Sequence, residues 1–167
     1  LMSPHALWIR AALIGVLASL AVTALIGTAI HVTGTAPFNM PPVAVFLASV
    51  VGITAKPAAL GLHLLYGTAW SLLFAGYFRA DMSLLKGLLL GGLMWAIMML
   101  ILSPIMGFGV AGFDAAHHKL PQDDPRYLGH PVKYMVMTLV AHLVYGFIVG
   151  LGNSRWTYRA LTPSAAG

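Results

Sequence analysis

The chain has 167 residues, of which 59% are hydrophobic and 8% are charged, and it contains no cysteine. Soluble domains carry about 25% charged residues, and a soluble fold of this length could not bury so much apolar surface, so the composition excludes a water-soluble domain. The net charge of +5 is scattered, which excludes a nucleic-acid surface. The lack of cysteine excludes disulfides, thiolate metal sites and cysteine nucleophiles. We therefore expect a single integral membrane domain over residues 1–167.

Hydropathy predicts four membrane-spanning helices, over residues 8–30, 57–78, 84–105 and 132–152. Each is about 20 residues or longer, which is enough to cross about 30 Å of hydrocarbon. The first segment lacks a convincing small-residue cleavage site, so we interpret it as a retained span rather than a signal peptide. The predicted fold class is an all-α integral membrane bundle of four transmembrane helices.

Two further segments connect these helices. Residues 42–55 are apolar but number only about 14, and a pair of prolines opens the segment, so we expect a short interfacial or re-entrant helix. Residues 107–131 contain three aspartates and three histidines. They predict a polar loop, with a helical turn or two around residues 112–119.

A sequence pattern occurs twice along the chain. His-Leu-Leu-Tyr-Gly at 63–67 recurs as His-Leu-Val-Tyr-Gly at 142–146. Arg-Ala-Ala-Leu-Ile-Gly at 10–15 aligns with Lys-Gly-Leu-Leu-Leu-Gly at 86–91. The spacing predicts two copies of one helical hairpin, each roughly 77 residues long.

The two predicted repeats cover residues 8–80 and 84–160. Each contains an even number of spans, so the two hairpins should run in the same direction. We therefore expect a parallel repeat, related by a pseudo-two-fold axis along the membrane normal.

Basic residues predict the orientation in the membrane. On one side they occur almost without acids, namely Arg10, Arg79, Lys86, Arg155 and Arg159. On the other side they are mixed with three aspartates, namely Lys56, Lys119, Arg126 and Lys133. Because cytoplasmic loops carry an excess of lysine and arginine, we expect both termini in the cytoplasm.

Small residues occur at equivalent positions of the two repeats, four apart on one helix face. These pairs are Ala11 with Gly15, Gly87 with Gly91, Gly67 with Ser71, and Gly146 with Gly150. Small residues at this spacing let membrane helices approach closely, so we expect them at helix–helix interfaces.

His63 and His142 are the candidate functional residues, at equivalent positions roughly 16 residues before an arginine, or about 24 Å along a helix. A histidine inside a membrane usually faces the bundle interior. In a purely structural interpretation, each imidazole forms a hydrogen bond across the bundle, to the other histidine, Thr23 or Thr138. A proton or substrate path is a further alternative, although no span contains a carboxylate.

The cofactor interpretation is bis-histidine ligation of one b-type haem, with His63 and His142 as axial ligands. Gly67 and Gly146 each follow a histidine by four residues and so lie one turn away on the same face. That spacing leaves a flat space beside each imidazole, in which a porphyrin would fit. These four residues form the predicted haem site, and no catalytic residue is predicted.

A second polar group lies in the loop at 107–131 and consists of His117, His118, His130, Asp114, Asp123 and Asp124. Imidazole and carboxylate are suitable ligands for divalent zinc or copper. The residues have no tight ligand spacing, however, so we favour a solvated loop and predict no metal site.

The chain resembles the uncharacterised prokaryotic four-helix membrane proteins that are akin to the YagU-like inner-membrane proteins. The resemblance rests on His63 with Gly67, on residues 86–91, on Ser-Pro-Ile-Met-Gly at 103–107, and on Gly129 onward into 141–146. It implies a four-helix architecture in the inner membrane of a prokaryote, and it implies no activity.

The sequence therefore predicts a non-enzymatic accessory or assembly subunit of a larger membrane complex, such as a respiratory one. Four short spans rich in small residues offer more packing surface than their own bundle uses. The expected partners are the lipid bilayer and other membrane subunits or a second copy, and no nucleic acid. The alternatives are a b-haem electron carrier that uses His63 and His142, and a small transporter or channel.

Overall fold

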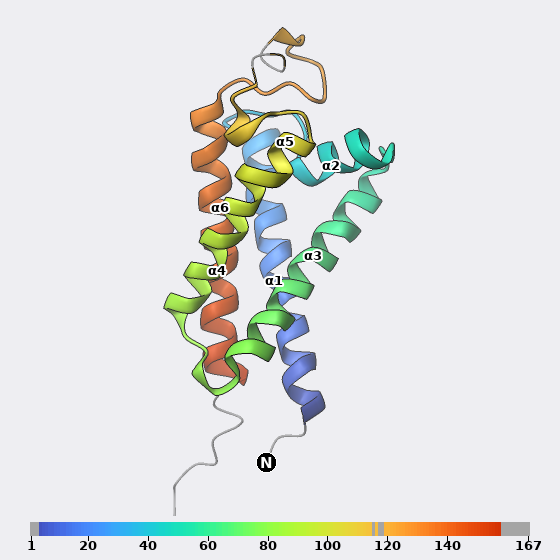
Figure 1. Cartoon of the computed structure of the whole chain (residues 1–167). Helices are drawn as coiled ribbons and strands as arrows, with labels where there is room; N and C mark the ends of the chain where they lie inside the picture. The colour runs from blue at the N-terminus through green and yellow to red at the C-terminus, as the bar shows by residue number, and fades with distance from the viewer. Residues whose placement is uncertain (1–3, 115, 117–118, 158–167) are drawn as a thin grey trace, which may run out of the picture.

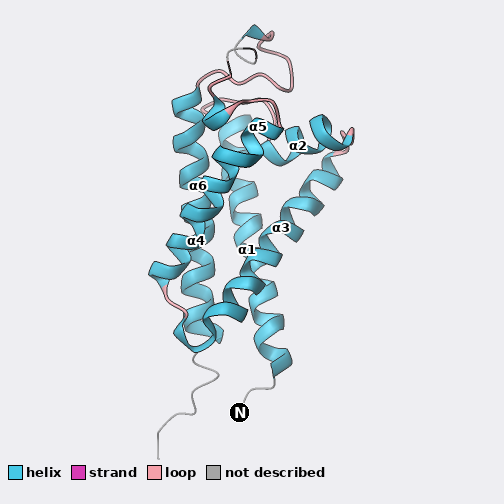
Figure 2. Ribbon diagram, viewed as in Figure 1, coloured by secondary structure: helices cyan, strands magenta, loops and turns pink. Residues whose placement is uncertain are grey.

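The computed structural model describes residues 4–114, 116 and 119–157, and every regular element in these ranges is a helix (Figures 1 and 2). The long helices are α1 (Pro4–His31), α3 (Lys56–Phe78), α4 (Leu84–Ile97) and α6 (Pro131–Gly152). They form an elongated bundle. We call the end that carries residues 32–55 and 106–130 the loop end, and the opposite end, where α1 begins and α6 finishes, the terminal end.

Four helical segments are long and apolar enough to cross a membrane, which confirms the four long apolar helices expected from hydropathy. They are His5–His31, Lys56–Asp81, Leu84–Ile105 and Pro131–Trp156. In each segment, at most 33% of the 18 most apolar consecutive residues are buried within the bundle. Most of these apolar residues therefore keep some surface exposed.

The third segment is a continuous helix whose winding changes near its end. α4 continues as a wider, π-type turn over Met98–Leu102 and then as α5 (Ser103–Ile105). Pro104 lacks an amide hydrogen, and its ring would clash with the carbonyl group four residues earlier. The wider turn directly before Pro104 relieves that clash.

The predicted short helix at 42–55 is confirmed as a helix, although it ends earlier. α2 (Pro42–Phe46) continues as a π-type turn over Leu47–Val51. Gly52 ends it with a φ of 74°, a left-handed conformation that glycine adopts without strain. Figure 1 shows α2 lying across the loop end, between the top of α1 and the start of α3.

The loop at 107–131 contains a 3-10 turn at Val110–Gly112, earlier than the turn expected around 112–119. Gly109 and Gly112 have φ values of 71° and 84°, so the helix can neither begin earlier nor continue through them. Part of the predicted turn, at residues 115, 117 and 118, lies outside the described residues.

The helices pack in the order α3, α1, α6, α4. α1 packs against α3 and α6, and α4 packs against α6. Within the described ranges, α3 and α4 share no comparable interface. A parallel pseudo-two-fold axis would make the α3–α4 pair equivalent to the α1–α6 pair, so the relation between the two hairpins stays a prediction.

Candidate functional site

α1 and α3 approach closely through small residues. A Cβ atom built on Gly15 would lie 2.8 Å from the Thr68 Cα and the Ser71 Cβ of α3. A Cβ atom on Gly67 would overlap the Ser19 hydroxyl and lie 3.1 Å from the ring of Tyr145. The packing role expected for this set of small residues is therefore confirmed.

α4 and α6 approach closely through the equivalent positions of the second hairpin. A Cβ atom on Gly87 would overlap the Gly146 carbonyl oxygen and lie 2.6 Å from the Gly150 backbone nitrogen. A Cβ atom on Gly91 would overlap the His142 carbonyl oxygen. The obstructing atoms are backbone atoms, which cannot rotate away.

Two polar side chains, from α3 and from the end of α6, meet a backbone carbonyl of α1 inside the bundle, near the terminal end. The Ser71 hydroxyl donates to the Ala11 carbonyl at 2.7 Å, which ties α3 to α1. The Asn153 amide donates to the Ser71 hydroxyl at 3.3 Å and to the Val149 carbonyl at 2.9 Å. Ser71 and Asn153 are fully buried. Each bond between helices satisfies a group that lipid cannot satisfy.

Further along the bundle, the Tyr145 hydroxyl of α6 donates to the Gly67 carbonyl of α3. Tyr145 is buried, and its ring also packs against Gly67. This contact joins α6 to α3 directly, at one of the two glycines assigned to the predicted haem site.

His63 lies on α3 beside the backbone of Ser19 and is half-buried. Its Nε2 atom is buried and has no hydrogen-bond partner among the described residues, and the same is true of the Ser19 hydroxyl. Leaving a buried polar atom unsatisfied costs about 1–3 kcal/mol. Such an atom in a native structure points to a missing water, ligand or partner.

His142 lies on α6 near His63 and is partly buried. Its Nδ1 atom contacts the Thr138 carbonyl of its own helix at 2.7 Å. A carbonyl can only accept, so Nδ1 carries the hydrogen and Nε2 keeps its lone pair. The predicted partner Thr138 is therefore present through its backbone, within one helix and not across the bundle.

The structure brings the four predicted haem-site residues into the bundle interior, but at different kinds of positions. His63 and His142 have Nε2 atoms with no partner in the described part of the chain. Beside Gly67 lie Ser19 and Tyr145, and beside Gly146 lies Gly87. The imidazoles fit a metal-ligand role, whereas a porphyrin against either glycine would require packed helices to separate.

Two more buried polar groups lie between α5 and α6 at the loop end. Tyr134 and Ser103 lie beside one another, and both hydroxyls are buried without a hydrogen-bond partner that meets normal geometry. The rings of Phe38 and Phe108 pack edge-on against Tyr134, with centroids 6.2 Å and 5.8 Å away. Aromatic packing fixes the position of this tyrosine.

The loop group does not assemble into a metal site in the part of the chain that is described. Asp114, Asp123 and His130 are exposed, and no three histidine or acidic residues in the described ranges come close enough to share an ion. His117 and His118 lie outside the described residues. Asp124 pairs with Arg126 at 3.3 Å, and this hydrogen bond and charge raise the pKa of Arg126.

No protein-family model, curated protein or solved structure matches the chain. The resemblance to the YagU-like proteins therefore stays a prediction that rests on the sequence motifs.

Proposed function

We propose that this chain is a polytopic protein of a prokaryotic inner membrane, with four spans and both termini in the cytoplasm. It acts without enzymatic activity, as an accessory or assembly subunit that packs against other membrane helices. Large apolar side chains on all four long helices face outward, including Leu17, Leu65, Leu89 and Val136. That surface supports insertion into lipid.

The position of His63 is the observation that most directly supports the subunit role. α3 packs against α1 and α2, but in the described part of the chain it has no comparable interface with α4. His63 lies half-exposed on this helix, with a buried Nε2 atom that lacks a partner. The part of His63 that stays exposed on α3 would contact the helix of a second subunit, since polar side chains commonly bridge packed membrane helices.

The two hairpins support the predicted internal repeat. Equivalent small residues form the α1–α3 and α4–α6 interfaces, with Gly15 against Gly67 in the first and Gly91 against Gly146 in the second. An axis that relates the hairpins belongs to the proposal, because only the interfaces within each hairpin are equivalent.

Photocrosslinking in native membranes tests the subunit role. A photoreactive residue at Leu65, which is 67% exposed on α3, should form an adduct with one membrane protein. The matched control at Leu17, which is 58% exposed on α1, should form adducts with lipid alone. His63→Leu should lower the yield at Leu65. The same adducts at both positions, or an adduct yield at Leu65 that does not change in His63→Leu, would contradict the proposal.

A b-haem carrier is the second candidate, because the Nε2 atoms of His63 and His142 suit iron ligation, although a porphyrin would have to separate the helices packed at Gly67 and Gly146. A haem bound there would supply one-electron transfer, with the two imidazoles holding the iron. The purified protein should then show a reduced-minus-oxidised b-type spectrum that disappears in His63→Ala and in His142→Ala. A colourless protein from haem-replete cells would leave only the subunit role.

A further inference from the structure

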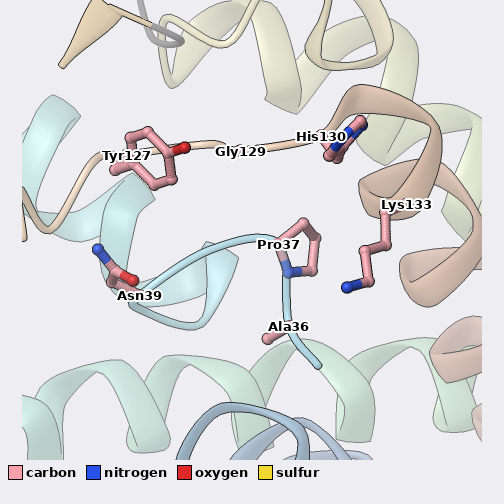
Figure 3. Close-up of a pocket in the computed structure, with 7 residues that line it drawn as sticks. All are labelled: Ala36, Pro37, Asn39, Tyr127, Gly129, His130 and Lys133. Carbon is pink, nitrogen blue, oxygen red and sulfur yellow. The ribbon is translucent and has the colours of Figure 1, made fainter. Parts of the chain in front are cut away.

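A hollow of about 180 Å³ lies at the loop end, where the segment that follows α1 meets the segment that leads into α6 (Figure 3). Its lining includes Pro37 and Asn39 from the first segment, and Tyr127, His130 and Lys133 from the second. The proposed function assigns no binding role to these residues.

The walls of this hollow are held by backbone contacts. The Gly129 amide donates to the Pro37 carbonyl at 2.8 Å, and Phe38 forms an isolated antiparallel bridge with Leu128. The Asn39 amide donates to the Asp124 carbonyl at 3.0 Å, which ties the loop to the same segment. The lining groups are thus fixed in position before any ligand arrives.

The polar groups of the hollow suit an anion. Lys133 forms no ion pair or hydrogen bond within the described ranges, so its ammonium group is available. In Figure 3 the Pro37 ring lies between this ammonium group and the Tyr127 hydroxyl, and the His130 ring is turned away from Pro37. No carboxylate lines the hollow. The Lys133 ammonium is therefore the group available to bind a phosphate.

A second, apolar hollow of about 310 Å³ lies on the outward side of the α4–α6 pair. It is lined only by apolar residues, Leu88 of α4 with Val140, Leu143, Val144 and Phe147 of α6. The spacing along α6 places Lys133, Val140, Val144 and Phe147 on one helix face.

The distance between the two hollows along α6 matches the distance between the headgroup and the acyl chain of one lipid molecule. Val140 is seven residues after Lys133, or about 10 Å along the helix, and Phe147 is about 21 Å from Lys133. One leaflet of the hydrocarbon core is about 15 Å deep. A headgroup beside Lys133 would thus place an acyl chain along Val140 and Val144.

We propose that α6 binds one anionic phospholipid. Its phosphate group lies beside the Lys133 ammonium, and one acyl chain lies in the groove formed by Leu88, Val140, Leu143, Val144 and Phe147. The site rests on the proposed insertion into a membrane. It defines a specific lipid partner on the face of the bundle away from α3.

Lipid binding is measured by native mass spectrometry of the purified protein in detergent, titrated with phosphatidylglycerol. Lys133→Glu should weaken binding about tenfold or more, because it reverses a charge beside the phosphate. The matched control is Lys56→Glu, an exposed lysine at the loop end that does not line the hollow. It should leave the affinity unchanged.

A second pair of variants tests the groove. Val140→Trp fills it and should weaken phosphatidylglycerol binding, whereas Leu73→Trp, at a position of α3 that is 62% exposed and outside the groove, should not. Soluble glycerol phosphate should bind far more weakly than the lipid. Glycerol phosphate binding as tight as the lipid would refute the acyl-chain part. Equal losses in Lys56→Glu and Lys133→Glu, or no loss in Lys133→Glu and Val140→Trp, would refute the site.

Membrane insertion is checked separately, by flotation of the same variants with liposomes. If every variant floats and the lipid affinities do not differ, the lipid site is wrong while the membrane proposal stands. If the wild-type protein does not float, the membrane proposal itself fails.

Discussion

Gly91→Ala should destabilise the bundle, because the added methyl group meets the backbone of the neighbouring helix. The new Cβ atom would overlap the His142 carbonyl oxygen and lie 3.0 Å from the carbonyl carbon. Overpacking a well-packed interface typically costs about 1–3 kcal/mol. Here the obstructing atoms belong to the backbone, so α4 and α6 must move apart. We expect the free energy of unfolding to fall by about 2–3 kcal/mol, near the upper end of that range, and to fall further in Gly91→Leu.

Gly92→Ala is the matched control, since no atom lies within 4 Å of the Cβ position at this neighbouring residue. Alanine forms helices better than glycine by about 0.8–1 kcal/mol in water, so Gly92→Ala should be neutral or slightly stabilising. Unfolding by SDS in mixed micelles, followed by the fluorescence of the 4 tryptophans, gives both free energies. Equal effects of the two variants would refute the close approach of α4 and α6.

Three further variants test the polar contacts inside the bundle. Tyr145→Phe removes the hydrogen bond to Gly67 and should cost about 0.5–1.5 kcal/mol, whereas Tyr77→Phe at a position 83% exposed should cost nothing measurable by the same assay. Ser71→Ala and Asn153→Ala should couple by about 0.5–1 kcal/mol in a double-mutant cycle, because their side chains share a hydrogen bond, and strict additivity would argue against it. His63→Leu should leave the stability of the isolated protein unchanged or higher, since it removes an unsatisfied buried atom, and a loss above about 1 kcal/mol would show that His63 has a partner within the chain.

Hydropathy and small-residue spacing predicted the parts of the fold that depend on local sequence. The four long helices follow from runs of apolar residues. Gly15, Gly67, Gly87 and Gly146 lie at helix interfaces, as their spacing indicated. The π-type turn before Pro104 was not predicted, although proline itself was a visible signal for it.

The contacts between distant segments could not be predicted. Asn153 and Ser71 are 82 residues apart, and Asn39 and Asp124 are 85 apart, and no pattern along one helix specifies such partners. The partner of His142 is the carbonyl of Thr138 in the same helix, which depends on a side-chain rotamer and not on periodicity. Hydrophobic periodicity also does not specify which two of four helices remain apart.

Reporter fusions test the central claim, that four helices cross the membrane and both termini are cytoplasmic. Fusions after Asp81 and Gly152 lie at the terminal end, and fusions after Asn39 and Gln122 lie at the loop end. A reporter that is active only outside the cytoplasm should be active after Asn39 and Gln122 and silent after Asp81 and Gly152, because the basic residues with few acids cluster at the terminal end. Fusions after Gln122 and Gly152 that are both active or both silent would place the two residues on the same side of the membrane and would contradict the four-span topology.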